Sequence, residues 1–173
     1  MNKNSSKKQE DHNYEQEDED PIDSTRKFFE GLGISQNISQ ISKSHYFYSE
    51  LIQNLLKVDA IARGRITCSF SVLPYVGNYY GGFHGAAVAA VAERLAIGCA
   101  RTMVTEDKQL FLGELSISYL SATPINVKMI ADASVVRSGR NLTVVSIEIR
   151  SKETNKLSYT AQATLFHLPT PKL

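Results

Sequence analysis

Residues 78–103, NYYGGFHGAAVAAVAERLAIGCARTM, decide the fold of this chain. A glycine-rich turn leads into a stretch from Gly85 to Met103 that is dominated by alanine and shows no strand-like alternation. This pattern predicts one helix of roughly 18 residues, about 27 Å long at about 1.5 Å per residue. A helix that is apolar around most of its circumference must be buried, and its small side chains let a sheet approach its backbone closely.

Segments with the period of two that is typical of strands lie on both sides of this helix. One precedes it and four follow it, at 65–72, 115–119, 127–135, 145–149 and 159–165. Two of the links between the later strands have the length of hairpin turns. The sequence therefore predicts an α+β fold in which an antiparallel sheet of five to six strands wraps around one long central helix.

The N-terminal part of the chain has a different composition. Residues 1–20 contain seven acidic residues and three lysines, and they include few apolar side chains. Such a segment cannot bury enough apolar surface to offset its ordering entropy, so we expect residues 1–23 to form a disordered acidic tail. Apolar spacing behind capping residues predicts N-terminal helices within 24–60, including one from Ser44 to Leu56. The sheet and central helix are then expected at 61–168.

Composition argues against several classes of protein. A net charge of +1 gives no electrostatic footprint for nucleic acid. No stretch approaches the roughly 20 apolar residues that a membrane span needs. The polar N-terminus lacks the apolar core of a secretory signal, which predicts an intracellular protein. The last three residues, Pro171-Lys172-Leu173, resemble a peroxisomal address of the Ser-Lys-Leu type with proline at its first position, so we expect the cytoplasm or the peroxisome.

Two features of residues 78–93 can carry chemistry. A turn containing His84 feeds directly into the helix start, where unpaired backbone N–H groups and the positive end of the helix dipole lie. The N–H of Gly85 is the best placed to hold a developing oxyanion, because glycine lets a ligand approach the backbone closely. Glu93 follows eight residues without a polar side chain, and we expect its carboxylate to be at least partly buried.

Each of these residues also has a purely structural interpretation. Glu93 fits the start of a solvated helix face, and His84 fits a residue that packs against or caps the helix. Asn78 fits an ordinary turn residue. The two cysteines, Cys68 and Cys99, lack the spacing of metal ligands and fit packed, reduced thiols. Pattern alone leaves these alternatives open.

One combination of residues resembles a known family. Its members share, in this order and ahead of a small-residue helix, the equivalents of Asn78, Gly81, His84, Gly85 and Glu93. This set resembles the hotdog-fold thioesterases of the phenylacetate-degradation and thioesterase-superfamily-member-2 type. The plant acyl-CoA thioesterase 13-like proteins are similar over nearly all of 63–167. Residues 113–120 look like the family's second strand, and residues 136–142 look like its basic hairpin.

The resemblance implies a hotdog fold and an acyl-CoA thioesterase, which hydrolyses acyl-CoA to CoA and a free acid. Glu93 matches the family's carboxylate, which acts as general base on water or as nucleophile. Asn78 matches the residue that positions the water or the carboxylate. The N–H of Gly85 matches the oxyanion donor, with His84 beside the thioester. No cofactor and no metal is expected, because a thioester carbonyl is a good electrophile.

The resemblance also implies where the substrate and a partner chain bind. Arg137, Gly139 and Arg140 match the region that meets the CoA phosphates, which suits the charge of the arginines. Ser116 lies on the strand that borders the site. The family's site is shared between two protomers, so a homodimer is the minimum and a dimer of dimers is expected.

Three positions depart from the family pattern. Ala86 stands where the family often has a second glycine after the histidine, and Glu93 replaces the aspartate of some members. Leu112 stands where some members have a serine or threonine that helps the catalytic water, although Ser116 or Ser118 on the same strand could approach in its place.

Leu112 therefore supports an alternative, a non-catalytic hotdog protein that binds acyl-CoA. A dehydratase of 3-hydroxyacyl thioesters would need a histidine base, and the thioesterase pattern already explains His84. A purely structural interaction module would give Glu93 no role.

Overall fold

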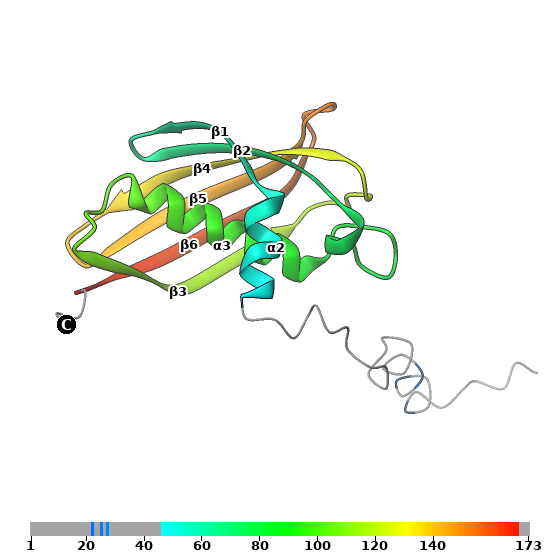
Figure 1. Ribbon diagram of the computed structural model, residues 1–173, viewed down its shortest axis with the longest axis horizontal. Coiled ribbons are helices and arrows are strands. Elements are labelled where there is room, and N and C mark those ends of the chain that lie inside the picture. Colours follow the sequence, from blue (N-terminus) through cyan, green and yellow to red (C-terminus); the bar gives the residue numbers. More distant parts are fainter. Residues whose placement is uncertain (1–21, 23–24, 26, 28–45, 170–173) are drawn as a thin grey trace, which may run out of the picture. The chain divides into compact units, whose positions relative to one another are not determined.

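The computed structural model describes Ile22, Thr25, Lys27 and residues 46–169 (Figure 1). The chain divides into two compact units, residues 1–38 and 39–173. In the first unit, the three described residues are helical and exposed. The predicted acidic tail lies, Ile22 apart, outside the described residues, and so does the C-terminal tripeptide.

The second unit is one antiparallel sheet with two α-helices. In chain order its elements are α2 (Phe47–Leu55), β1 (Lys57–Ala62), β2 (Arg65–Ser71), the 3-10 turn η2 (Pro74–Val76), α3 (Gly85–Arg101), β3 (Lys108–Tyr119), β4 (Lys128–Ser138), β5 (Leu142–Ser151) and β6 (Leu157–Pro169). The six strands are ordered β1-β2-β4-β5-β6-β3, with each neighbouring pair antiparallel. This arrangement confirms the predicted α+β hotdog fold.

The core lies between α3 and one face of the sheet (Figure 1). Val91, Ala92 and Ala96 on the buried side of α3 have no exposed surface. Opposite them, small side chains recur on the sheet, including Ala131 in β4 and Ala163 in β6, both fully buried. Because both surfaces are built from small residues, the helix can lie close to the strands, as the alanine-rich sequence predicts.

Strand β1 falls in a stretch for which the sequence predicted helices up to residue 60. All six of its residues are exposed, so burial imposes no alternating pattern on them. Its conformation comes from antiparallel pairing with β2 across a turn at Gly64, which has φ +74°. An edge strand without a buried face leaves no periodic signal, which explains why the sequence did not reveal it.

Strand β3 forms the other edge of the sheet and contains a bulge at Gly113, between Leu112 and Glu114. A Cβ atom at Gly113 would lie 2.2 Å from Cε2 of Phe166, so the aromatic ring occupies the space of a side chain there. No helix in the part of the chain that the structure describes is long and apolar enough to cross a membrane.

We predict that Ala96→Leu lowers the free energy of unfolding by about 1–3 kcal/mol, because a larger side chain has no space between α3 and the sheet. Ala60→Leu is the matched control, since it adds the same volume at an exposed position of β1. Chemical denaturation of the two variants and the wild type measures the difference. Equal stability of both variants would show that the contact between helix and sheet is loose.

Candidate active site

The loop that enters α3 is folded by Asn78. Its side-chain Oδ1 accepts hydrogen bonds from the N–H groups of Tyr80 at 3.0 Å and Gly82 at 2.9 Å. Its own N–H donates to the carbonyl of Gly82 at 2.7 Å, and Gly81 between them has φ +74°, which favours glycine. Asn78 is thus a turn residue whose oxygen is occupied. Its Nδ2 group, which has no partner among the described residues, remains able to donate to a ligand.

His84 caps the start of α3. Its Nδ1 accepts a hydrogen bond from the N–H of Ala86 at 3.1 Å, and its backbone N–H donates to Val76 O at 2.9 Å. The imidazole is exposed. A ring that accepts at Nδ1 carries its proton at Nε2, so the cap orients one N–H donor toward the surroundings. The structural interpretation of His84 is confirmed, and it leaves Nε2 open to a further role.

Gly85 is the first residue of α3, so its N–H has no acceptor within the helix. Tyr119, at the end of β3, covers this residue, and its hydroxyl donates to the carbonyl of Gly85 at 3.1 Å. A Cβ atom at Gly85 would meet the Tyr119 ring no closer than 3.6 Å, which is ordinary contact. The donor end of α3 is therefore bordered by an aromatic side chain and still accommodates a methyl group.

Tyr119 belongs to a chain of aromatic rings that continues through Tyr159 and Phe83 to Phe70. Burial raises the pKa of the Tyr159 hydroxyl, so this group stays neutral beside the helix start. The alternation in β3 placed Tyr119 on the same face as Ile117. Its hydrogen bond to Gly85 depends on the tertiary structure and was not predicted.

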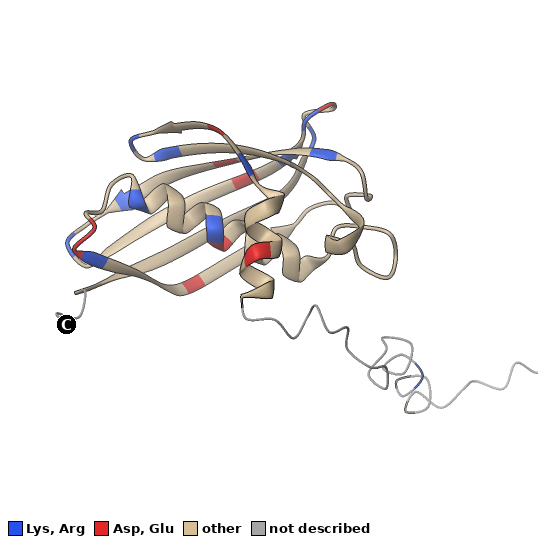
Figure 2. Cartoon of the chain, in the orientation of Figure 1, with Lys and Arg blue, Asp and Glu red and all other residues tan. Residues whose placement is uncertain are grey.

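Glu93 is exposed, which corrects the expectation of partial burial. The helix turns Val91, Ala92 and Leu95 toward the sheet, so Glu93 lies on the opposite side, next to Arg94 in the sequence. Figure 2 shows an acidic and a basic band side by side on α3. The carboxylate borders a cavity of about 190 Å³ between α2 and α3, whose other walls include Tyr48, Ser49, Ile52, Ala90 and Ile97. Arg94 lines the same cavity, and among the described residues no side chain buries the carboxylate.

The carboxylate and the helix start lie apart within one chain. Glu93 follows Gly85 by eight residues in the same helix, which is about 12 Å at about 1.5 Å per residue. Groups that act together on one carbonyl must each come within about 3 Å of the reacting atoms. The structure therefore brings Asn78, His84 and Gly85 together, while Glu93 lies two turns further along the helix.

The predicted phosphate-binding residues lie at the other end of α3. Arg137 is exposed near the end of β4, and Gly139 and Arg140 belong to the exposed connection between β4 and β5, which lies beside the C-terminal end of α3 (Figure 1). The carbonyl of Arg140 accepts hydrogen bonds from Lys108 Nζ at 3.3 Å and from His167 Nδ1 at 3.2 Å. These hydrogen bonds hold the turn around Gly139 and Arg140 in place, and we call it the basic turn. The length of α3 separates it from Gly85.

Strand β3 turns Ser116 away from the site. Ser116 is paired with Gln162, and both are exposed on the sheet face that does not carry α3. Leu112, paired with the fully buried Leu165, lies on the α3 side. Within one chain, neither Ser116 nor Ser118 therefore takes the place of a hydroxyl at Leu112. That Ser116 binds the substrate stays a prediction.

The two cysteines do not supply a nucleophile. Both are buried and free. Burial raises the pKa of the Cys68 thiol to about 11, and the carboxylates of Asp59 and Asp132 contribute to the shift. Burial likewise raises the pKa of Cys99, so both thiols stay protonated near neutral pH. Among the described residues, no three His, Cys, Asp or Glu side chains gather where they could hold a metal ion.

A protein family and several solved structures are similar to this chain. Residues 80–158 match the Thioesterase superfamily. The matched region starts just after Asn78 and includes His84, Gly85, Glu93 and the basic turn. No curated protein matches the chain.

Solved structures share the fold. A thioesterase from Haemophilus influenzae has a TM-score of 0.65 at 22% identity, over 79% of this chain and 96% of that one. Zebrafish thioesterase superfamily member 2 has a TM-score of 0.63 at 20% identity, over 85% of this chain and 97% of its own. A hypothetical thioesterase from Streptococcus pneumoniae, solved with coenzyme A, has a TM-score of 0.60 at 18% identity, over 69% and 90% of the two chains. At these identities the similarity establishes the hotdog fold.

Proposed function

We propose that the protein is an acyl-CoA thioesterase, of the thioesterase-superfamily-member-2 and plant acyl-CoA thioesterase 13-like type. The observation that carries the proposal is the start of α3. There the unpaired N–H of Gly85, the Nε2–H of His84 and the amide of Asn78 lie on one short segment. Three neutral donors at the positive end of a helix suit the oxygen of a thioester carbonyl as it becomes an oxyanion.

The reaction needs one base and one oxyanion site. The thioester oxygen accepts hydrogen bonds at the helix start, and the carboxylate of Glu93 activates a water or attacks the carbonyl carbon itself. If Glu93 activates a water, the tetrahedral intermediate collapses, the carbon–sulfur bond breaks, and CoA leaves as its thiol with the proton taken from that water. If Glu93 attacks the carbon itself, the same bond breaks to give CoA and an anhydride of Glu93 with the acyl group, which a water then hydrolyses to the free acid and the carboxylate. The chemistry proceeds without a metal or an organic cofactor.

Two chains complete each site in this proposal. The separation of about 12 Å between Gly85 and Glu93 along α3 prevents both from acting on one carbonyl in a single chain. Around Glu93 on this side of α3 lie the exposed Ala86 and the half-buried Ala90 and Ile97, a largely apolar surface suited to a second copy. A two-fold axis across the helix pair would bring the partner's carboxylate toward each Gly85.

The same two-fold arrangement gives the basic turn a role in binding, although the turn lies far from Gly85 of its own chain. If the paired helices run antiparallel, the C-terminal end of one α3 lies beside the N-terminal end of the other. Arg137 and Arg140 of one chain then approach the site that begins at Gly85 of its partner, where they would bind CoA phosphates. We propose a homodimer as the functional unit, assembled further as a dimer of dimers, which acts in the cytoplasm or the peroxisome.

One observation favours a second candidate, a hotdog protein that binds acyl-CoA without hydrolysing it. Leu112 lies on the α3 side of β3, where a hydroxyl that assists the catalytic water is expected, and Ser116 and Ser118 point away. A dehydratase is less well supported, because Nδ1 of His84 is occupied by the helix cap.

We expect Glu93→Gln to lower turnover of acyl-CoA by about 10²- to 10⁴-fold, the usual effect of removing an acid–base group. Glu114→Gln, which changes an exposed carboxylate on β3, is the matched control and should leave turnover unchanged. Release of free thiol from acyl-CoAs of short to long chain measures both variants beside the wild type.

The outcome separates the two candidates. Loss of thiol release in Glu93→Gln alone supports the thioesterase and identifies the preferred chain length. An inactive wild type that still binds acyl-CoA would establish the binding protein instead.

A pair of substitutions at Gly85 isolates the proposed oxyanion donor. Proline is tolerated at the first position of a helix, and His84 has the extended φ and ψ (−68°, 129°) that a following proline requires. Gly85→Pro therefore removes one N–H from a folded helix start, and we expect kcat to fall by about 10²- to 10³-fold. Gly85→Ala keeps the N–H and should retain most activity. Equal losses in both variants would indicate a steric effect.

Mixing two inactive variants tests whether the site is shared. In a dimer of one Glu93→Gln chain and one Gly85→Pro chain, one site receives both defects and the other receives none. Re-associating equal amounts of the two should therefore restore about a quarter of wild-type activity, because half of the dimers are mixed and each has one intact site. Absence of recovery, with mixed dimers confirmed by mass spectrometry of differently tagged chains, would place each site within one chain.

A further inference from the structure

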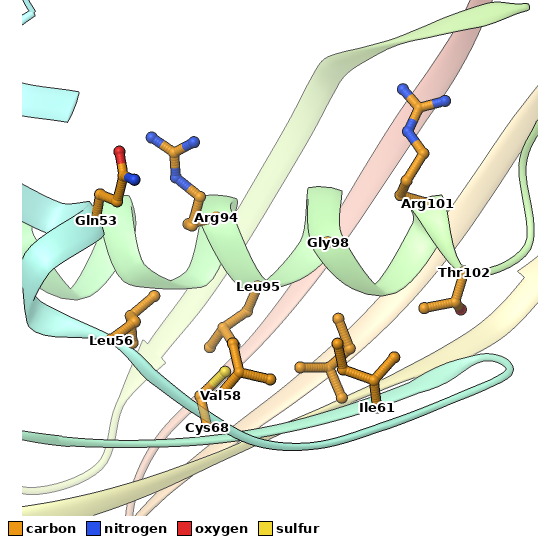
Figure 3. Close-up of a pocket in the computed structure, with 11 residues that line it drawn as sticks. Gln53, Leu56, Val58, Ile61, Cys68, Arg94, Leu95, Gly98, Arg101 and Thr102 are labelled. Carbon is orange, nitrogen blue, oxygen red and sulfur yellow. The ribbon is translucent and has the colours of Figure 1, made fainter. Parts of the chain in front are cut away.

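The β1–β2 hairpin borders two cavities that differ in charge. The first lies between α3 and the hairpin, has a volume of about 540 Å³, and is lined by apolar side chains that include Leu56, Val58 and Leu95 (Figure 3). The second has a volume of about 390 Å³ and lies where β2 ends and β4 begins. Both volumes are in the usual range for small-molecule sites. We call the second one the lysine cavity.

The lysine cavity concentrates positive charge. Lys57, Lys128 and Lys152 line it, together with the hydroxyl-bearing Ser69 and Ser71. The three lysines come from three segments of the chain, namely β1, the start of β4 and the residue that follows β5. No aspartate or glutamate of the described residues is part of the lining. The fold thus gathers cations that are far apart in a sequence with a net charge of only +1.

Strand pairing fixes four of these residues on one face of the sheet. Lys57 lies opposite Ser69, and Lys128 lies opposite Ser71. Residues that are directly opposite in an antiparallel pair point to the same face. Because Ser69 and Ser71 alternate with the buried Phe70, all four polar side chains belong to the face that does not carry α3.

Backbone hydrogen bonds hold the third lysine and the ends of the strands in place. The N–H of Lys152 donates to the carbonyl of Lys128 at 2.9 Å. The end of β2 is tied to the start of β4, since the N–H of Val72 donates to Val127 at 3.0 Å and the N–H of Asn126 donates to Val72 at 2.7 Å. The backbone around the cavity is therefore formed before a ligand binds, and only side chains need to be ordered.

Neighbouring carboxylates do not neutralise the three lysines. Asp132, on the same face, accepts a hydrogen bond from Thr67 Oγ1 at 2.7 Å, and Glu148 pairs with Arg150. Within the part of the chain that the structure describes, none of the three ammonium groups forms an ion pair or a hydrogen bond. An anion in the cavity would therefore replace repulsion between like charges with several attractive contacts.

We infer that the lysine cavity binds a phosphate monoester group. Its double negative charge matches a cluster of three cations, and its oxygens accept hydrogen bonds from the ammonium groups and from the hydroxyls of Ser69 and Ser71. The apolar side chains of Leu55 and Leu73, which also line the cavity, contact the organic part of the ligand. A carboxylate, with one charge and two oxygens, matches this lining less well. The inference goes beyond the proposed function and does not rest on it.

Binding of phenyl phosphate to the full-length chain tests the inference. Saturation-transfer NMR detects the ring protons of the bound molecule, and a titration gives the dissociation constant. We expect saturable binding that weakens with added salt and is at least about tenfold tighter than binding of phenyl sulfate, which has a similar shape and one charge fewer. The readout involves no thioester, so failure of the thioesterase proposal and failure of this inference are distinguishable.

Four variants locate the bound phosphate. Lys57→Gln and Lys128→Gln each remove one cation from an exposed position, and each should weaken phenyl phosphate binding by at least about fivefold. Lys156→Gln is the matched control, because it removes an exposed lysine of the β5–β6 link that does not line the cavity. Arg140→Gln, in the basic turn, separates the cavity from the region proposed for the CoA phosphates. Both of these variants should bind phenyl phosphate like the wild type.

Vesicle flotation distinguishes the two sources of a phosphate monoester. Phosphatidylcholine vesicles are compared with and without phosphatidic acid, whose headgroup is a phosphate monoester. Flotation that requires phosphatidic acid and is lost in Lys128→Gln identifies a lipid headgroup as the ligand. Binding of phenyl phosphate without flotation identifies a soluble phosphorylated metabolite.

Three results would overturn the inference. One is that the wild type binds neither phenyl phosphate nor phosphatidic acid. Another is binding that Lys57→Gln and Lys128→Gln leave unchanged, which would place the phosphate elsewhere. The third is a loss of binding confined to Arg140→Gln, which would assign the phosphate to the basic turn.

Discussion

The close contact between α3 and the sheet is the constraint on which the rest of the structure depends. Alanine on the helix faces alanine on the strands, and the central residues of both surfaces have no exposed area. A helix packed this closely on strands β2 to β6 cannot rotate or slide without a clash, because protein interiors are close-packed. The positions of its first residue, its exposed face and its C-terminal end are all fixed by that one interface.

The candidate site follows from the way the chain reaches this helix. The loop before α3 needs the side chain of Asn78 to close its turn, and the helix start needs His84 to accept a hydrogen bond from the N–H of Ala86. Both polar side chains therefore stabilise the local fold, and each still has a nitrogen that can donate a hydrogen bond to a ligand. The same loop has a structural role and a proposed chemical role. It leads into α3 at Gly85, whose N–H is unpaired, and it carries the donor groups of Asn78 and His84.

The exposed side of α3 borders two cavities. Glu93 and Arg94 both line the cavity between α2 and α3, and Arg94 also lines the cavity between α3 and the β1–β2 hairpin. Two adjacent residues of opposite charge thus share one cavity, while the helical rotation of about 100° per residue lets only Arg94 reach the second one.

Much of this protein was determined by sequence alone. The alanine-rich helix, the alternating strands and the glycine-rich turn predict the fold and its central element. The spacing of apolar residues and the size of side chains can be read from neighbouring residues in the sequence. The tertiary structure decided the rest. It placed β1 as an exposed edge strand, turned Ser116 away from the helix and exposed Glu93, because each outcome depends on pairing register and packing direction between distant segments. The separation of about 12 Å between Gly85 and Glu93, by contrast, already follows from the helix that the sequence predicts, because local backbone hydrogen bonds fix the rise per residue.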